Sequence, residues 1–243
     1  MPKKRPESGS ASHAVRTEWL RRVEAEYRSS AITQHLTLWL TQLGAPPVFV
    51  RAGLRISGDE IAHAEASHRT YRLAGGTSGP HLPRESLGLH RNDERAPLED
   101  DVARIVVDVF CLGETVAVRL FRELRDKCTI DVARRALDRI LRDEVRHREF
   151  GWTVLPWLLE QPFGPRVRVL VERELPAYFG RMRSAYLRPV GNPFDDADRA
   201  WGLMPLSLYA SALEKTLRVD WIPRFSKLGF HPEAAFNAEL PRP

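Results

Sequence analysis

The sequence predicts an all-α fold, namely a four-helix bundle with a long crossover between helices 2 and 3 and extra C-terminal helices. Apolar residues recur every three or four positions through four long segments between residues 15 and 159, as they do in amphipathic helices. The motif Asp-Glu-x-x-His-x-Glu occurs twice, at residues 59–65 and 143–149. Each copy follows a lone glutamate on an otherwise apolar helix face, Glu26 before the first and Glu114 before the second.

The composition favours a single helical domain without a nucleic-acid or membrane partner. The chain has 243 residues and a formal net charge of +5. Its arginines are spread along the predicted helices, which indicates a solvated basic surface rather than a nucleic-acid site. Apolar runs such as residues 105–110 are far shorter than the roughly 20 residues that span a bilayer. Because there are two cysteines and no apolar signal segment, we expect a cytoplasmic protein.

The first 160 residues divide into a tail and four helices. Residues 1–13 are rich in Pro, Lys and Ser and are expected to be disordered. The bundle is expected over residues 14–160, with helices at about 15–43, 47–73, 98–125 and 130–159. The connection over residues 75–97 is long for a compact domain. Such a connection is expected where two antiparallel hairpins are joined by a crossover along the bundle.

The last third of the chain is expected to pack on this bundle. Residues 161–243 contain two further helical patterns, at about 165–186 and 206–228. A stretch rich in Pro and Asp over residues 189–198 separates them. We therefore expect a C-terminal helical extension that also lines a pocket of the bundle.

Six residues are candidate metal ligands. Residues three apart lie on one face of a helix, so each Glu-x-x-His directs a carboxylate and an imidazole toward one point. A four-helix di-metal site takes one Glu from each of two helices and Glu-x-x-His from each of the other two. The candidates in this chain are Glu26, Glu60, His63, Glu114, Glu144 and His147.

Burial of four carboxylates requires a compensating charge. A single Glu or His is more simply a surface residue or a satisfied core histidine, but four acids on four apolar faces need the charge of two divalent metal ions. Asp59 and Asp143 immediately precede the motif glutamates and are turned by about 100° toward a neighbouring helix. We expect each to accept the N–H of a ligating histidine from the other helix.

Other residues compete less well for a place in the site. Glu65 and His68 repeat the Glu-x-x-His spacing, but they lie off the face of the first motif and are expected at the surface. Glu24 is two residues from the first candidate ligand and points about 200° round the helix from it. Tyr27 and Cys111 are expected to pack near the site without a redox role.

The ordered set of motifs resembles the ferritin-like di-iron carboxylate superfamily, which includes ribonucleotide reductase small subunits, bacterial multicomponent monooxygenases and rubrerythrins. The resemblance rests on Glu26 ahead of Gly44-Ala45-Pro46, and on residues 59–64, 113–115 and 143–147. It covers about residues 19–159 as fold. Within this range the chain is similar to a group of bacterial ferritin-like proteins of mostly unassigned function.

This resemblance implies one metal held mainly by Glu26, Glu60 and His63, the other mainly by the second Glu and Glu-x-x-His set, and carboxylates that bridge the pair. The metals would be two iron ions, with manganese or a mixed manganese and iron pair as the alternative. Two cysteines cannot supply a four-cysteine rubredoxin module. Ile140 stands where arylamine N-oxygenases carry an extra His, and the extra C-terminal helices disfavour an iron-storage cage.

The leading functional hypothesis is a di-iron oxidase or hydroxylase. The resemblance implies that it would activate dioxygen, with electrons from a donor, to oxidise a small organic or carrier-bound substrate. Small residues are expected to leave room beside the metals, namely Gly53, Ala64, Ser67, Gly113 and Gly151. The alternatives are a ferroxidase or manganese-catalase-like protein that handles iron or peroxide, and a non-catalytic helical interaction module with a structural metal site. Ferritin-like bundles often dimerise, so a homodimer is one expected state.

Overall fold

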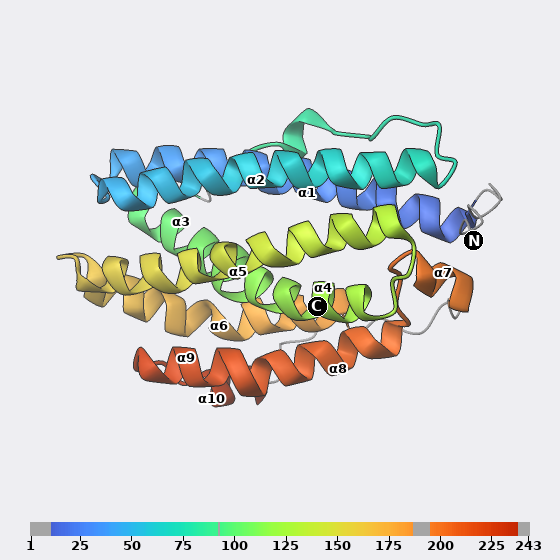
Figure 1. The fold of residues 1–243 in the computed structure, drawn as a ribbon. Coiled ribbons are helices and arrows are strands. Elements are labelled where there is room, and N and C mark those ends of the chain that lie inside the picture. The colour runs from blue at the N-terminus through green and yellow to red at the C-terminus, as the bar shows by residue number, and fades with distance from the viewer. Residues whose placement is uncertain (1–10, 92, 187–194, 238–243) are drawn as a thin grey trace, which may run out of the picture.

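The computed structural model describes residues 11–91, 93–186 and 195–237, and every regular element within these ranges is a helix (Figure 1). The all-α class is therefore confirmed. In chain order the elements are α1 (His13–Gln42), α2 (Pro47–Leu73), the short 3₁₀ turn η1 (Arg84–Ser86), α3 (Leu98–Ile105), the π-helix η2 (Val106–Glu114), α4 (Thr115–Asp126), α5 (Asp131–Glu160), α6 (Gly164–Tyr186), α7 (Asp196–Ala200), α8 (Leu206–Thr216), the π-helix η3 (Leu217–Trp221), α9 (Ile222–Lys227) and α10 (Pro232–Asn237).

The first two helices form an antiparallel hairpin, and α1 and α2 pack along their whole lengths (Figure 1). The side chain of Ser12 caps α1 by accepting a hydrogen bond from the backbone N–H of Val15. Gly44 follows α1 at a φ of +69°, a conformation that costs little for glycine and ends many helices. Pro47 then opens α2 at a position where its missing N–H is no loss. These boundaries lie within two residues of the predicted ones.

The segment between α2 and α3 runs beside α1. The backbone N–H of His81 donates to Glu24 on α1. Further along the same helix, the ring Nδ1 of His35 accepts from the backbone N–H of Leu89. The segment passes over the outer side of the α1–α2 hairpin (Figure 1). It therefore connects the end of α2 to the start of α3 while covering part of α1.

The third predicted helix is one helical run from Leu98 to Asp126, but its centre differs from the prediction. Nine residues, Val106–Glu114, form the π-helix η2 instead of a regular α-helix. A π-turn is wider than an α-turn, and η2 packs against Gly151 of α5. A Cβ added at Gly151 would lie 2.6 Å from the Cβ of Phe110 and 2.8 Å from the backbone N of Cys111. The close approach of η2 to α5 therefore depends on a glycine in the facing helix.

The C-terminal helices share the core of the first five. One continuous set of buried apolar residues extends from Trp19 on α1 to Trp221 and Phe225 near the C-terminal end. The indole N–H of Trp19 donates to the carbonyl of Trp201, which also joins the two parts. The predicted helices at 165–186 and 206–228 are confirmed as helical, and the short helices α7 and α10 are additional to the prediction. The extension packs on α1–α5 as part of the same hydrophobic core.

The predicted disordered tail needs a correction at its end. Residues 1–10 lie outside the described residues, as do 187–194 of the Pro- and Asp-rich stretch. Residues 11–13, however, are ordered against the rest of the chain. Ala11 donates its N–H to the carbonyl of Ala74, and the hydroxyl of Ser12 donates to Asp198 at 2.5 Å. A helix cap and two long-range hydrogen bonds fix this part, which composition alone did not reveal.

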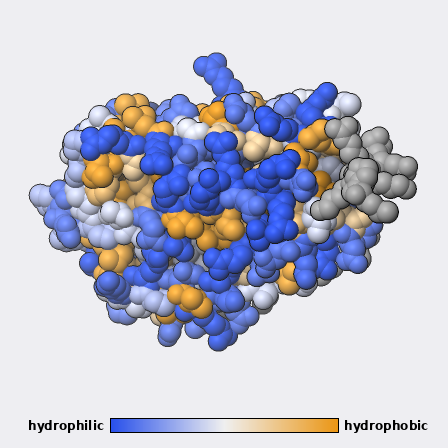
Figure 2. All heavy atoms as spheres, in the orientation of Figure 1, coloured by the Kyte–Doolittle hydropathy of each residue, from blue (hydrophilic) through white to orange (hydrophobic). Residues whose placement is uncertain are grey.

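The outer surface is mostly polar. Figure 2 shows hydrophilic residues over most of one face, with apolar residues in separate patches. Among the described residues, no helix combines the length and the apolar character needed to cross a membrane.

Candidate metal centre

The six predicted ligand residues come together in the interior, from four segments of the chain. Each of the six is at most 8% exposed. Their ligand atoms form two overlapping groups, and within each group the atoms lie within 4.8 Å of one another. The first group consists of Glu26, Glu60, His63 and Glu144, and the second of Glu60, Glu114 and His147. Glu60 belongs to both groups, so it lies at the centre of the cluster.

Both imidazoles direct the same nitrogen toward the carboxylates. The Nδ1 of His63 lies 3.3 Å from Glu60, 3.8 Å from Glu26 and 4.0 Å from Glu144. The Nδ1 of His147 lies 3.3 Å from Glu60 and 3.6 Å from Glu144. The ring centroids are 5.7 Å apart. The two Nδ1 atoms therefore face the carboxylates of Glu60 and Glu144, each imidazole in its own group of candidate ligands.

The other nitrogen of each imidazole meets an aspartate from the opposite helix. The Nε2 of His63 on α2 lies 3.1 Å from Asp143 on α5, and the Nε2 of His147 on α5 lies 3.4 Å from Asp59 on α2. This exchange between helices is the arrangement that the sequence predicts for the two aspartates. A carboxylate at Nε2 retains the proton there, which leaves the lone pair on Nδ1 for a cation.

Arg146 joins the two aspartates, although the sequence analysis left it without a role. Its Nη2 donates to Asp59 at 3.0 Å and to Asp143 at 2.7 Å. The side chain is 39% exposed, so it closes the outer side of both His–Asp pairs at the protein surface. The spacing of Arg146 three residues after Asp143 is the available sequence signal, because such pairs meet on a helix.

Ser29 is a second group that the sequence analysis missed. It lies on α1 one turn after Glu26, and its hydroxyl donates to Oε1 of Glu60 at 2.9 Å. A serine three residues after a candidate ligand shares its helix face, which is the signal that could have found it. The hydrogen bond fixes the orientation of the central carboxylate.

Burial changes the protonation of the carboxylates. It raises the pKa of Glu26 to about 8, and it also raises the pKa values of Glu114 and Glu144, the latter further because Glu114 is its neighbour. Burial acts on Glu60 in the same direction. The contacts of Glu60 with the two imidazoles outweigh burial, however, and hold its pKa below the ordinary range. Glu60 is therefore the carboxylate that stays ionised without a metal.

The histidines hold protons in the same metal-free cluster. Burial alone would lower the pKa of His63, but Glu26 and Glu60 outweigh it and raise that pKa to about 11. Glu60 likewise outweighs burial at His147 and raises its pKa to about 9. A metal ion that binds here must displace these protons, because imidazole and carboxylate bind metals only in their deprotonated forms.

The residues present fit a pair of divalent cations. Four ionised glutamates and two neutral histidines carry a charge of −4, which two divalent ions cancel. Among the described residues, Nδ1 of His147 and Oε2 of Glu144 are buried without a hydrogen-bond partner of good geometry. Buried polar atoms without partners cost free energy, and a cation would satisfy both. Oxygen and nitrogen donors without sulfur suit iron or manganese.

A pocket of about 520 Å³ opens onto the cluster. Its floor includes all four glutamates, and its apolar sides come from η2, α4 and α6. The apolar lining residues include Val109, Ala117, Leu120, Phe121 and Met182. Tyr186 on α6 and Tyr209 on α8 also line it. The expectation that the C-terminal extension lines a pocket is thus met by α6 and α8.

The small residues near the cluster have different roles from the predicted one. A Cβ added at Gly53 would lie 2.1 Å from Oγ1 of Thr37, so this glycine permits close packing of α1 and α2, as Gly151 does for η2 and α5. Gly113 alone of the five lines the pocket. Ala64 and Ser67 are buried on α2. The prediction that all five leave room beside metals was therefore wrong for the two helix-contact glycines.

The residues that compete for a place in the site lie at the surface, except for Cys111, which is buried. Glu65 and His68 are exposed, and Glu24 accepts a hydrogen bond from the segment that covers α1. Tyr27 is 38% exposed. Cys111 is fully buried on η2, and burial raises the pKa of its thiol well above the ordinary value. These positions match the predictions for Glu65, His68 and Glu24.

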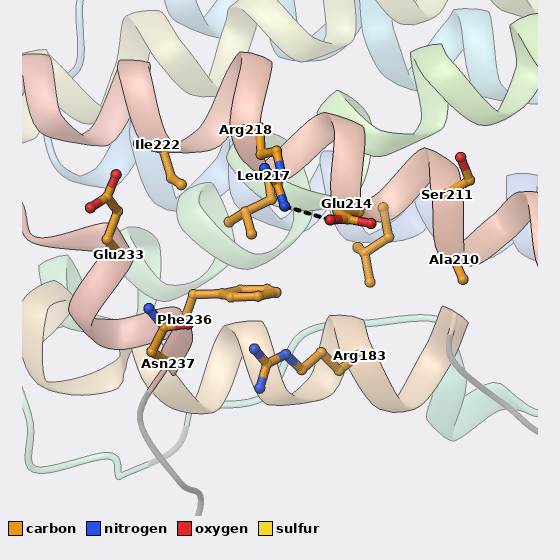
Figure 3. A pocket seen from close by; sticks show the side chains of 11 residues that line it. Arg183, Ala210, Ser211, Glu214, Leu217, Arg218, Ile222, Glu233, Phe236 and Asn237 are labelled. Atoms are coloured by element: carbon orange, nitrogen blue, oxygen red, sulfur yellow. Dashed lines mark hydrogen bonds and ion pairs between the residues drawn. The ribbon is translucent and has the colours of Figure 1, made fainter.

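A larger groove of about 800 Å³ lies elsewhere, between α6, the α8–α9 stretch and α10 (Figure 3). Arg183 and Phe236 line it, and Glu214 pairs with Arg218 at 2.7 Å along its edge. None of the six candidate ligands contributes to it. The larger of the two hollows is therefore not the one that contains the buried carboxylates and imidazoles.

Comparison with protein-family models, with curated proteins and with solved structures gives no match to this chain.

Proposed function

We propose that the chain is a ferritin-like di-metal carboxylate protein and that its activity is that of an oxidase or hydroxylase. In this proposal α1, α2, the α3–η2–α4 run and α5 act as the four helices of the bundle, and the segment after α2 is the crossover. The observation that carries the proposal is the cluster of four glutamates and two histidines, each histidine backed by an aspartate from the facing helix.

Each part of the cluster has a defined task. Glu26, Glu60, Glu114 and Glu144 supply oxygen donors, and His63 and His147 supply Nδ1 donors. Two iron ions, or manganese in place of one or both, would add redox chemistry with dioxygen that these side chains lack. Asp59 and Asp143 hold the imidazole protons at Nε2.

The pocket favours an organic substrate over iron or peroxide handling. A cavity of about 520 Å³ with apolar sides lies directly over the glutamates, and its volume is in the range of small-molecule sites. Ferrous ion or hydrogen peroxide would need no apolar cavity of this size.

Elemental analysis tests the metal part of the proposal. Protein purified without a metal-binding tag is expected to contain about two iron or manganese atoms per chain, and the Glu60→Ala/Glu144→Ala double variant is expected to contain almost none. The matched control is the Glu65→Ala/His68→Ala variant, which removes a Glu-x-x-His pair of the same spacing from the exposed face. A wild-type protein that cannot be loaded with ferrous or manganous ions would contradict the proposal.

Oxygen consumption tests the activity. The reduced, metal-loaded protein is expected to consume dioxygen faster than the Glu144→Ala variant, with a further increase when a substrate is present. Fast turnover of ferrous ion or peroxide without an organic compound would instead indicate the ferroxidase or catalase alternative. Full metal content with no turnover of any kind would leave a structural metal site in a helical interaction module.

A further inference from the structure

The pocket over the cluster has a polar end as well as apolar sides. Glu18, Arg21 and Arg22 of α1 line it together with Glu26 and Ser29, which lie further along the same helix. With a rise of about 1.5 Å per residue, Arg22 and Glu26 are separated by about 6 Å along the helix axis. The pocket therefore extends from the glutamates toward the N-terminal part of α1, where its charged residues lie.

The three charged side chains of α1 at this end of the pocket have a net charge of +1. Glu18 accepts hydrogen bonds from Arg21 at 2.9 Å and from Arg22 at 3.3 Å, and these contacts outweigh burial and hold the pKa of Glu18 below its ordinary value. Two guanidinium groups and one carboxylate sum to +1. On the other lip of the pocket, Arg181 and Asp108 pair at 2.9 Å and neutralise each other.

Arg22 has an unused donor in this site. Its side chain is 5% exposed, and its Nη2 donates to the carbonyl of Gly202. The guanidinium group lies over the ring of Trp19. Its Nη1 is buried without a hydrogen-bond partner among the described residues. A buried guanidinium N–H without an acceptor is costly, so an anionic ligand oxygen would be stabilised there.

Two tyrosines complete the polar end. Tyr186 and Tyr209 stack with their ring centroids 6.3 Å apart and line the pocket. Burial, and secondarily Tyr209, raise the pKa of Tyr186 to about 12, so its hydroxyl stays a donor at neutral pH. Leu120, Phe121 and Met182 also line the pocket and offer no charge to a ligand.

We propose that this pocket binds an amphipathic monocarboxylate, with the carboxylate at Arg21 and Arg22 and the apolar chain extending toward the glutamates. The substrate of the site would then be a monocarboxylate, and this assignment rests on the proposed oxidase or hydroxylase function. Guanidinium groups bind carboxylates through charge-assisted hydrogen bonds, and Nη1 of Arg22 has no acceptor among the described residues. The end of the chain away from the carboxylate would be the part held next to the metal cluster.

Equilibrium binding tests this orientation, with octanoate and neutral 1-octanol as a pair of probes. The full-length protein is titrated by calorimetry both after chelation and after loading with ferrous or manganous ions under anaerobic conditions. Octanoate is expected to bind about tenfold more tightly than 1-octanol in both forms, because a hydrogen bond to a charged group contributes roughly that factor. The Arg21→Gln variant is expected to lose this preference while its affinity for 1-octanol stays the same.

Three variants serve as comparisons. Arg21 is 62% exposed, so its substitution is expected to leave the fold intact. Arg22→Gln also removes the hydrogen bond to the carbonyl of Gly202, so the folding of this variant is checked first. Ala117→Phe fills part of the pocket and is expected to weaken the binding of both probes. Arg183→Gln alters an arginine of the groove in Figure 3 and is expected to change neither.

Two results would overturn the inference. Equal affinity for octanoate and 1-octanol in the wild type would remove the anion site. Octanoate binding that requires the metal and ignores Arg21→Gln and Arg22→Gln would place the carboxylate at the cluster instead. Both results are read from ligand binding and not from redox turnover, so a failure of this inference is separate from a failure of the proposed function. A chelated protein that still discriminates the probes supports the inference even if no redox turnover is found.

Discussion

The two halves of the cluster are alike in sequence but differ in their polar support. In the first half, Glu60 accepts hydrogen bonds from Ser29 and from Nδ1 of His63. In the second half, Oε2 of Glu144 has no partner, and the position equivalent to Ser29, three residues after the lone glutamate, is Ala117. One half is thus held by protein hydrogen bonds, and the other leaves a carboxylate oxygen unsatisfied.

Both halves line the open pocket, the first of them with Glu26, Ser29 and Glu60. Gly113 and Ala117 line the pocket next to Glu114 and Glu144, and the π-helix that carries Glu114 belongs to the second half alone. π-turns occur frequently at functional sites. The two halves therefore differ in the π-helix and in the missing hydroxyl, and not in their access to the pocket.

The largest expected effect is a difference between Glu60→Gln and Glu144→Gln in the metal-free protein. Glu60 contacts both histidines, whose pKa values are raised, and is itself held ionised by them, so its loss removes the carboxylate that the two imidazoles share. Glu60→Gln is expected to lower the free energy of unfolding by about 3–5 kcal/mol. Burial and the neighbouring Glu114 raise the pKa of Glu144 well above its ordinary value, which favours its neutral form, so an amide is expected to replace it at a cost of less than about 1 kcal/mol. Urea denaturation after chelation measures both.

The pH dependence of this pair sharpens the comparison. Because the folded-state pKa of Glu144 is raised above the unfolded one, its contribution to stability is full below the ordinary glutamate pKa and is lost as pH rises. The Glu144→Gln variant lacks this loss. Its stability relative to wild type is therefore expected to increase from pH 5 toward neutral pH, and equal losses for both variants at all pH values would contradict the comparison.

A second contrast separates packing glycines from pocket glycines. Gly151→Ala places a Cβ against the Phe110–Cys111 backbone, where the π-helix cannot move away freely, and is expected to cost about 1–3 kcal/mol. At Gly113 the nearest atom to an added Cβ is the carbonyl oxygen of Asp108, at 3.5 Å. Gly113→Ala is therefore expected to leave the unfolding midpoint nearly unchanged. Gly58→Ala, with open space at its Cβ, is the control for helix propensity.

Much of the site could be predicted because helical spacing carries it. The Glu-x-x-His repeat places donors on one face, and the lone Glu26 and Glu114 supply the two remaining segments. The same argument predicts the aspartates, since the residue before each motif glutamate turns toward the neighbouring helix. The six donors and both His–Asp pairs lie together as these patterns indicate, while their role as metal ligands stays a prediction.

The remaining features depend on contacts between helices, which spacing within one helix does not contain. The π-helix η2 follows from its fit against Gly151 on a helix far away in the sequence. The role of Arg146 requires Asp59 on α2 as well as Asp143 on its own helix. Gly53 was expected beside the metals because it shares a face with Glu60, but the partner that meets this glycine is Thr37 of α1.

The smallest expected effect is an exchange of the hydroxyl between the two halves. Ser29→Ala removes the hydrogen bond to Glu60 and is expected to lower the free energy of unfolding of the chelated protein by about 1 kcal/mol. Ala117→Ser offers a hydroxyl to the unsatisfied Oε2 of Glu144, and its effect is expected to have the opposite sign. Urea midpoints of the two variants and of their combination provide the measurement. If Ala117→Ser destabilised the protein as much as Ser29→Ala does, the missing hydroxyl would not be what distinguishes the two halves, and the space beside Glu144 would have to be explained by the π-helix alone.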